Sequence, residues 1–172
     1  MSNARVHAGC LACELADGRR PLPGGRVAEH GGWVVEHAVG PLGVGTLVVK
    51  PVRHVLHVAD LDESESAALG PLLRRVSAAV TELVRPEQVY VCLWSHAGGE
   101  PGHIHFVVQP VRRADMERFD AFGPALQGAM FAEDERPDPA AVEEFCARVR
   151  PLLGSAQDEV MSSYRLPDGS AK

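Results

Sequence analysis

Five residues of this chain carry the donor atoms for a metal site and a reactive imidazole. Cys10 and Cys13 are separated by two residues, a spacing that lets two thiolates chelate one metal ion. His103 and His105 alternate with apolar residues, so both imidazoles project from the same face of a predicted strand. His54 lies between the two motifs. The set predicts a zinc site with one histidine left over for chemistry.

A closed structural zinc site takes four ligands in a tetrahedral arrangement. We expect these ligands to be Cys10, Cys13, His54 and His103. His57 is the alternative to His54. A redox pair is the rival interpretation of the two cysteines, but a loop follows them in the prediction, where a thioredoxin-like unit would have a helix.

His105 is the predicted reactive group. It follows His103 by two residues, about 6.5 to 7 Å along a strand, so it lies beside the metal without being a ligand. A neutral imidazole is a competent nucleophile toward phosphorus near pH 7. The alternative is a core histidine bonded to a carbonyl, and the local sequence does not decide between the two.

Phosphate contacts are predicted at two places. Residues 95–99 (Ser-His-Ala-Gly-Gly) offer backbone N–H groups and a hydroxyl, although a simple connector has the same composition. Arg53 would neutralise phosphate charge. The predicted substrate-binding residues are Ser95, His96, Gly99 and Arg53.

Composition sets wide bounds on the class of protein. The 172 residues suffice for one well-buried core, and 45% apolar with 23% charged residues is typical of a globular domain. A net charge of −6 without a Lys/Arg block argues against broad binding to duplex nucleic acid or membrane. The N-terminus has no hydrophobic signal core, so we expect a cytoplasmic location, where cysteines are thiols or metal ligands.

Periodicity predicts strands and helices in the order that these motifs need. The expected strands are a hairpin of 27–30 and 33–37 around Gly31-Gly32, then 46–50, 89–94 and 104–109. A helix is expected over 61–83, with Pro71 kinking it or marking its start. Residues 98–102 are expected to form a flexible loop beside the histidines.

The last third of the chain has a different character. Residues 112–119 are expected to be helical, and Asp138-Pro139 is a good N-cap for a helix over 140–149. The polar residues beyond Gly154 are expected to fray. The predicted organisation is therefore a core domain, 1–112, and a mainly helical extension, 113–172, packed on the core or on a dimer interface.

Three segments in this order resemble the histidine triad (HIT) superfamily. Residues 45–54 resemble its strand and loop, and residues 103–110 resemble its triad strand with the following proline. Residues 10–13 resemble the zinc-binding start of many bacterial members and of the related galactose-1-phosphate uridylyltransferase. The resemblance covers roughly residues 8–112.

The resemblance implies an α+β fold with an antiparallel sheet and packed helices, often as a homodimer. It also implies nucleotidyl hydrolysis or transfer at an α-phosphate, with substrates such as dinucleoside polyphosphates, nucleoside phosphoramidates or nucleotide sugars. By position in the motif, His105 attacks phosphorus and forms a nucleotidyl-histidine, while His103 joins a structural zinc.

One departure from the family pattern matters. Val107 stands where the family has a third histidine, or glutamine in the uridylyltransferase branch, and the loss of such a donor costs about 1.5 to 3 kcal/mol. Two functions therefore remain: a nucleotidyl hydrolase or transferase, and a zinc-stabilised nucleotide-binding protein without turnover. A third, zinc-activated water, needs an open three-ligand site.

Overall fold

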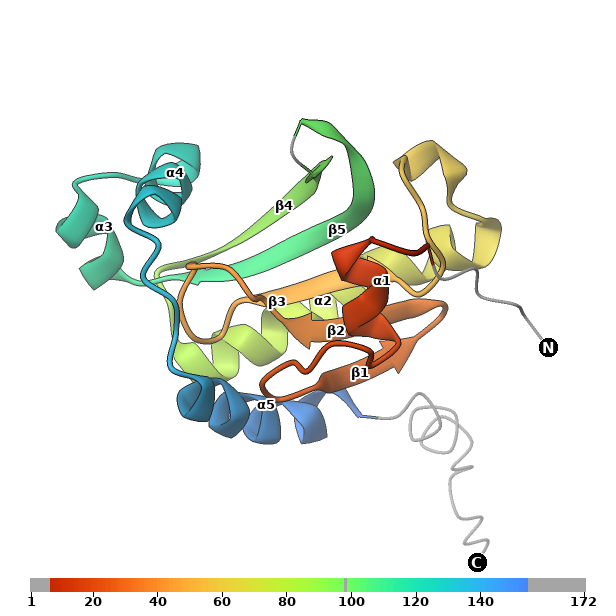
Figure 1. Cartoon of the computed structure of the whole chain (residues 1–172). Coiled ribbons are helices and arrows are strands. Elements are labelled where there is room, and N and C mark those ends of the chain that lie inside the picture. Colours follow the sequence, from red (N-terminus) through yellow and green to blue (C-terminus); the bar gives the residue numbers. More distant parts are fainter. Residues whose placement is uncertain (1–6, 98, 155–172) are drawn as a thin grey trace, which may run out of the picture.

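A five-stranded antiparallel sheet forms the centre of the molecule (Figure 1). The structure is a computed structural model, and it describes residues 7–97 and 99–154. The strands are β1 (Arg26–His30), β2 (Trp33–His37), β3 (Leu47–Pro51), β4 (Gln88–Ala97) and β5 (Glu100–Val111), in the spatial order β1-β2-β3-β5-β4. The α+β fold class with an antiparallel sheet is confirmed.

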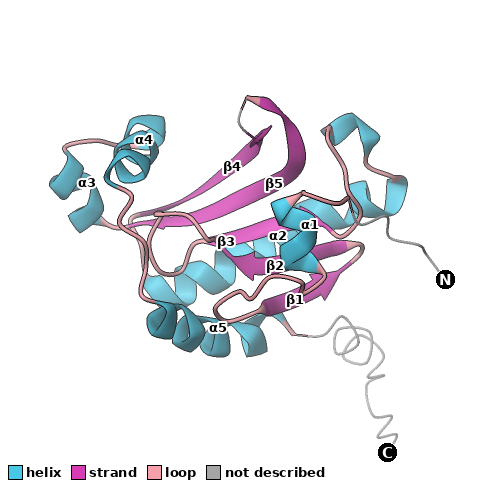
Figure 2. Ribbon diagram, viewed as in Figure 1, coloured by secondary structure: helices cyan, strands magenta, loops and turns pink. Residues whose placement is uncertain are grey.

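Helices cover both faces of this sheet (Figure 2). On one face, α2 (Glu63–Val84) and α5 (Pro139–Leu153) enclose the main hydrophobic core with side chains of β2, β3 and β5. On the other face lie α1 (Leu11–Ala16), α3 (Arg113–Phe119) and α4 (Gly123–Glu133); a short 3₁₀ turn, η1 (Val58–Asp60), precedes α2. Among the described residues, no helix is both long and apolar enough to cross a bilayer.

Alternation along β5 assigns its side chains to these two layers. Phe106 and Val108 pack in the main core. Val107 and Val111 pack in a second cluster with residues of α4. Because successive side chains point to opposite faces, His103 and His105 share the face of Val107.

The β1–β2 hairpin forms as the glycine pair predicts. Gly31 and Gly32 have φ values of 54° and 82°, and two positive φ values in a two-residue turn match the right-handed twist of the strands. A Cβ on Gly31 would also lie 2.5 Å from the Cβ of Ala68 in α2. The turn therefore approaches α2 more closely than any other residue type allows.

The start of α2 is set by a capping box. The Asp62 carboxylate accepts the Glu65 backbone N–H at 2.8 Å, and the Glu65 carboxylate accepts the Asp62 N–H at 3.0 Å. The helix then runs through Pro71 to Val84. The alternative that Pro71 marks the true start is wrong, because the Asp62 cap nine residues upstream already satisfies the first turn.

The connection between β4 and β5 differs from the expected loop. β4 continues to Ala97 and β5 begins at Glu100, and these two residues pair across a tight hairpin. The ladder is irregular between Trp94 and His96. Cross-strand pairing extends both strands through a segment whose glycine-rich and proline-containing composition suggested a loop.

The C-terminal helices pack against the sheet layers. Asp138 caps α5 by accepting the Ala140 N–H at 3.3 Å, as predicted. Phe145 and Val149 of α5 enter the main core, whereas α3 and α4 pack together over the opposite face. The expected fraying beyond Gly154 lies outside the described residues, and the domain division at residue 112 stays a prediction.

Candidate functional site

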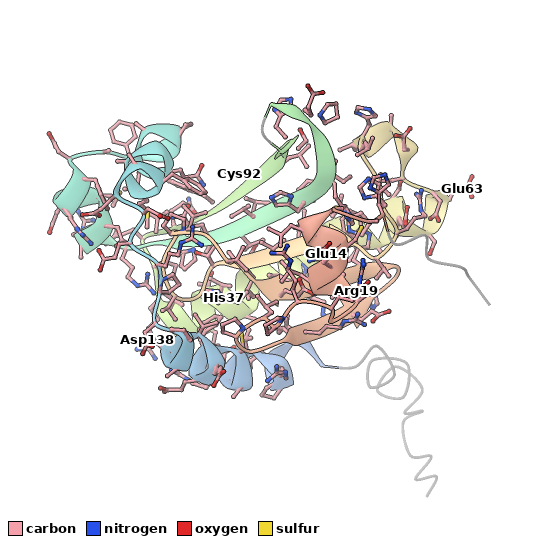
Figure 3. All side chains as sticks on the ribbon, viewed as in Figure 1. Glu14, Arg19, His37, Glu63, Cys92 and Asp138 are labelled. Atoms are coloured by element: carbon pink, nitrogen blue, oxygen red, sulfur yellow. The ribbon has the colours of Figure 1, made fainter. Side chains whose placement is uncertain are left out.

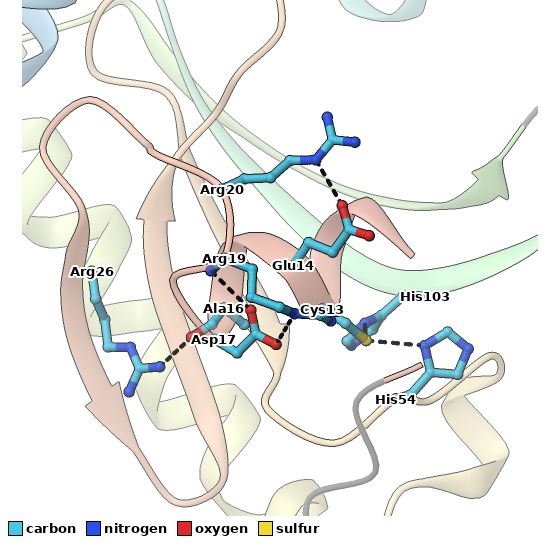
Figure 4. A network of polar contacts seen from close by, with 9 residues as sticks. All are labelled: Cys13, Glu14, Ala16, Asp17, Arg19, Arg20, Arg26, His54 and His103. Atoms are coloured by element: carbon cyan, nitrogen blue, oxygen red, sulfur yellow. Dashed lines mark hydrogen bonds and ion pairs between the residues drawn. The ribbon is translucent and has the colours of Figure 1, made fainter. Parts of the chain in front are cut away.

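The four predicted zinc ligands converge at one point. Their donor atoms, on Cys10, Cys13, His54 and His103, all lie within 4.8 Å of one another. Cys13 Sγ is 3.3 Å from His54 Nδ1 and 3.4 Å from His103 Nδ1 (Figure 4). Cys10 Sγ is 3.8 Å from His103 Nδ1. Tetrahedral Zn–S and Zn–N bonds of ordinary length separate sulfur and nitrogen by about 3.6 Å. The cluster therefore fits a zinc ion.

The two cysteines are presented by α1, which is held against β1. Cys10 is the N-cap of this helix and Cys13 lies in its first turn, so both sulfurs face the same side. The Arg26 guanidinium of β1 donates to the Ala16 carbonyl at the end of α1 (Figure 4). Arg20, in the loop that follows α1, pairs with Glu14 of that helix at 2.7 Å.

His54 lies in the loop after β3, and two backbone hydrogen bonds fix that loop. The Val52 N–H donates to the Gly32 carbonyl at 2.8 Å, and the Ile104 N–H donates to the Val55 carbonyl at 2.9 Å. The second bond ties the loop to β5 beside His103. His57, the alternative ligand, is instead the N-cap of η1.

The hydrogen bonds of His103 prepare it as a ligand. Its Nε2 lies 2.9 Å from the Pro51 carbonyl, which can only accept, so we assign the proton to Nε2 and a lone pair to Nδ1. Burial, and then the nearby His54, lowers the pKa of His103 to about 4. The imidazole is therefore neutral at physiological pH, as metal binding requires.

The pKa of the Cys13 thiol is shifted in the opposite direction to that of His103. Burial raises its pKa, and neighbouring Cys10 acts in the same direction. A zinc ion binds thiolates, so its binding would displace the thiol protons.

A pocket of about 560 Å³ adjoins the cluster, on the sheet face that α1 covers. His105 and His96 line it, together with apolar side chains that include Leu11 and Val39. The His105 Nδ1–H donates to the His103 carbonyl at 3.0 Å, which leaves the lone pair on Nε2. The volume suits a small organic ligand.

The pocket floor contains a buried ion pair that the sequence analysis missed. Lys50 Nζ lies 2.5 Å from Glu36 Oε2, and both side chains are only 3% exposed. One signal was available in the sequence, since Lys50 stands in a strand predicted to be buried. Its partner Glu36 comes from β2, and only the β2–β3 register brings the two together.

The wall of the pocket includes a histidine with a structural role. The buried His37 donates from Nδ1 to the Ala38 carbonyl at 2.8 Å, and its Nε2 accepts the Gly45 N–H at 3.0 Å. Burial lowers its pKa, so the neutral ring closes the loop between β2 and β3.

The predicted substrate-binding residues do not all come together. His96 lines the pocket, whereas Ser95, Gly99 and Arg53 are not among the described residues that do. The Arg53 guanidinium instead donates to both Glu65 carboxylate oxygens, at 3.1 and 2.6 Å, beside the cap of α2. This placement gives no support to Arg53 as a phosphate ligand.

Val107 lies outside the pocket lining of the described residues. It is 5% exposed and packs in a cluster with Leu42, Leu126 and Met130. The third motif position is thus covered by α4. A longer side chain there would meet a hydrophobic helix before it met a ligand.

The remaining cysteines lie elsewhere. Cys92, on β4, lies on the side of α4, with its sulfur 3.8 Å from the Gln127 side-chain oxygen (Figure 3). Cys146 is buried on α5 against Gly24, and burial raises the pKa of its thiol.

Several solved structures with a similar fold are described as histidine triad proteins. A zinc-bound histidine triad family protein from Mycobacterium smegmatis is 20% identical, with 90% of this chain and 97% of that one covered and a TM-score of 0.60. A Hit-like protein involved in cell-cycle regulation from Bartonella henselae is 16% identical (85% and 97% covered, TM-score 0.65). A hypothetical histidine triad nucleotide-binding protein from Sulfolobus tokodaii is 18% identical (84% and 91% covered, TM-score 0.62).

These likenesses establish the histidine triad fold for this chain. No protein-family model matches the chain, and no curated protein matches it. The finer resemblance to the galactose-1-phosphate uridylyltransferase branch stays a prediction.

Proposed function

We propose that this protein is a HIT-type nucleotidyl hydrolase or transferase acting at the α-phosphate of a nucleotide conjugate. The observation that carries the proposal is the state of His105. Its Nδ1 proton is committed to the His103 carbonyl, and it lines a ligand-sized pocket beside the cysteine–histidine cluster. An imidazole fixed in this tautomer has one nucleophilic nitrogen, Nε2.

The chemistry follows from that nitrogen. Nε2 of His105 attacks the α-phosphorus, a P–N bond forms, and the bond from phosphorus to the leaving group breaks with its electron pair. The resulting imidazolium keeps its Nδ1–H bond to the His103 carbonyl, which stabilises the positive charge. Water or a second acceptor then attacks phosphorus, and the P–N bond breaks to restore His105.

The cysteine–histidine cluster has a structural role in this proposal. Zinc held by Cys10, Cys13, His54 and His103 would have four protein ligands and no open position for water. Because His103 and His105 are two residues apart on β5, ligation of the first fixes the backbone that carries the second. This arrangement disfavours a mechanism in which zinc activates water.

The pocket lining suggests how a nucleotide is held. Leu11 and Val39 give an apolar wall for a base, and His96 on the β4–β5 hairpin can donate to a phosphate oxygen. Ser95 and Gly99 belong to the same hairpin, and their role in substrate binding stays a prediction.

Binding without turnover is the second candidate function. The burial of Val107 under α4 favours it, because the position that supplies a third polar group in the family pattern is occupied by core. Both candidate functions involve binding of a nucleotide ligand, and they differ in whether a bond to the α-phosphorus is broken.

A panel of adenylylated substrates would decide between them, with free AMP or adenylyl transfer as the readout. The panel would contain an adenosine phosphoramidate, a diadenosine polyphosphate and an adenylylated sugar phosphate. We expect turnover by the wild type, none by His105→Ala, and wild-type turnover by His57→Ala, since His57 lies outside the cluster and the pocket lining. Binding of AMP without turnover of any substrate would show that the protein binds nucleotides without catalysing a reaction on them.

We further propose a homodimer formed through the edge strand β4. Val91 and Leu93, on the sheet face shared by Val108 and Phe106, are 45% and 43% exposed, which is unusual for apolar residues of an edge strand. Light scattering should give the mass of two chains, and a Val91→Glu, Leu93→Glu double variant should give one. A wild-type monomer would overturn this part of the proposal.

A further inference from the structure

Lys50 is an unusual residue in this chain. The sequence has 15 arginines and two lysines, Lys50 and Lys172, and Lys50 is the one within the described residues. Its side chain is 3% exposed and pairs with Glu36. A fully buried ammonium is costly even when it is paired, so stability alone does not account for a lysine at this position.

Strand register places Lys50 next to His105. Val49 of β3 pairs with Phe106 of β5 in the antiparallel ladder. Lys50 follows Val49, and His105 precedes Phe106, so the two are cross-strand neighbours on one face. Both residues line the pocket, and both act electrostatically on His103.

Lys50 is the source of permanent positive charge in the described part of the pocket lining. Among the described residues that line the pocket, Lys50 is the one lysine or arginine. Arg53 is committed to Glu65, and Val107 is buried beneath α4. A phosphate held in front of His105 would therefore find its strongest charged donor on the pocket floor.

We propose that Lys50 is the anion-binding residue of this pocket, and that it binds a non-bridging phosphate oxygen of the ligand. Glu36 is its positioning residue, because the carboxylate holds the ammonium on the floor until an anion competes for it. A compact ammonium on a flexible stem can turn from one acceptor to the other, which a planar guanidinium cannot do as easily. The inference deepens the proposed function by assigning the group that receives the phosphate charge.

Calorimetric titration of the zinc-loaded full chain tests this role without requiring turnover. The probes are inorganic pyrophosphate and AMP, with adenosine as the probe that lacks a phosphate. The Lys50→Met, Glu36→Gln double variant removes both charges at similar volume, so that no unpaired charge is left in the floor. An Arg113→Met, Glu87→Gln double variant is the matched control, because it removes an exposed ion pair outside the described pocket lining.

We expect the Lys50→Met, Glu36→Gln variant to bind both phosphate probes at least about tenfold more weakly, with adenosine unaffected. Glu36→Gln alone should bind them more tightly, because the competing carboxylate is gone. A purely structural pair would not give effects of opposite sign. Unchanged pyrophosphate affinity in both variants, or no pyrophosphate binding by the wild type, would overturn the inference.

The outcome is separable from that of the proposed function. If His105 forms a covalent adduct but the pyrophosphate affinity does not depend on Lys50, the inference about Lys50 is wrong and the proposed function stands. Lys50-dependent binding without turnover of any adenylylated substrate would defeat the proposed function alone.

Discussion

The two halves of one face of β5 have opposite characters. His103 and His105 lie beside a pocket and a metal cluster, whereas Val107 and Val111 lie under α4 in a hydrophobic cluster. The strand alternation is the same throughout. The difference comes from what covers the face: α1 at one end and α4 at the other. A side chain's role on this strand is therefore set by the covering helix as much as by its place in the alternating pattern.

Val107 lies in the half of this face that α4 covers, which explains why the residue is hydrophobic. Beyond it, Gln109 is buried and accepts the Gln127 side-chain N–H of α4 at 2.9 Å, so even the polar residue there serves packing. Val107 is thus part of the interface with α4. The charge that the family pattern places on this strand is, in our proposal, supplied from the neighbouring strand by Lys50.

Substitution of the two metal-binding cysteines should destabilise the protein most. A Cys10→Ser, Cys13→Ser variant should bring zinc from one ion per chain to near zero and lower the unfolding free energy by at least about 4 kcal/mol. Metal analysis and denaturant unfolding provide the readouts. Cys92→Ser is the matched control, since Cys92 contacts Gln127 and not the cluster. Unchanged zinc content in the double variant would contradict the ligand set.

The stability of the zinc-free protein should depend on pH through the histidines of the half beside the metal cluster. Burial lowers the pKa of His103 to about 4, below the value of about 6.5 for an unfolded chain. Between these two values the unfolded chain binds more protons, so stability is present above pH 6.5 and is lost as pH falls toward 4. The loss should be about 3 kcal/mol, with His37 and His54 acting in the same direction.

Denaturant unfolding of the zinc-free protein across this range checks the sign and the source of the effect. His103→Asn should flatten the slope, because an amide does not titrate. An equally steep slope in that variant would show that other groups cause the pH dependence.

A smaller loss of stability is expected from substitution of Val107, in the half covered by α4. Val107→His places a polar ring in the cluster with α4, and an unpaired buried polar group costs about 1 to 3 kcal/mol. We expect lower stability and no gain in turnover. Val91→His, on the exposed surface of β4, should be nearly neutral for the folding of one chain. A Val107→His variant with normal stability and faster turnover would mean that this position faces the ligand.

The smallest effect concerns Arg53, outside both halves. Arg53→Gln should lower the unfolding free energy by about 1 kcal/mol, because the guanidinium is partly exposed while its partner Glu65 is buried. AMP affinity, measured by calorimetry, should stay at the wild-type value. A tenfold weaker affinity for AMP would restore Arg53 as a phosphate ligand.

Local signals in the sequence predicted much of this molecule. The glycine pair of the β1–β2 hairpin and the Asp138 cap each act within a few residues, and each has the predicted form. The loop predicted directly after the two cysteines is wrong, because Cys10 and Cys13 begin the short helix α1. The cysteine–histidine cluster was also predictable, because metal coordination restricts which residue types and spacings can meet.

Features that depend on strand register or on distant packing were not predictable. The Glu36–Lys50 pair requires the β2–β3 alignment, and the burial of Val107 requires α4, which starts sixteen residues later in the sequence. The contact of Arg53 with Glu65 was not predictable for a similar reason, because Glu65 lies on α2; a phosphate contact of Arg53 stays a prediction.

In the proposed reaction, Nε2 of His105 becomes covalently bound to phosphorus. Rapid mixing of the zinc-loaded protein with an adenylylated substrate, followed by a denaturing quench and peptide-level mass spectrometry, would detect that bond. We expect one adenylyl group on the peptide that contains His105, absent from the His105→Ala variant, which should keep its zinc. An adenylyl group on another residue, or turnover by His105→Ala at the wild-type rate, would contradict the proposed reaction.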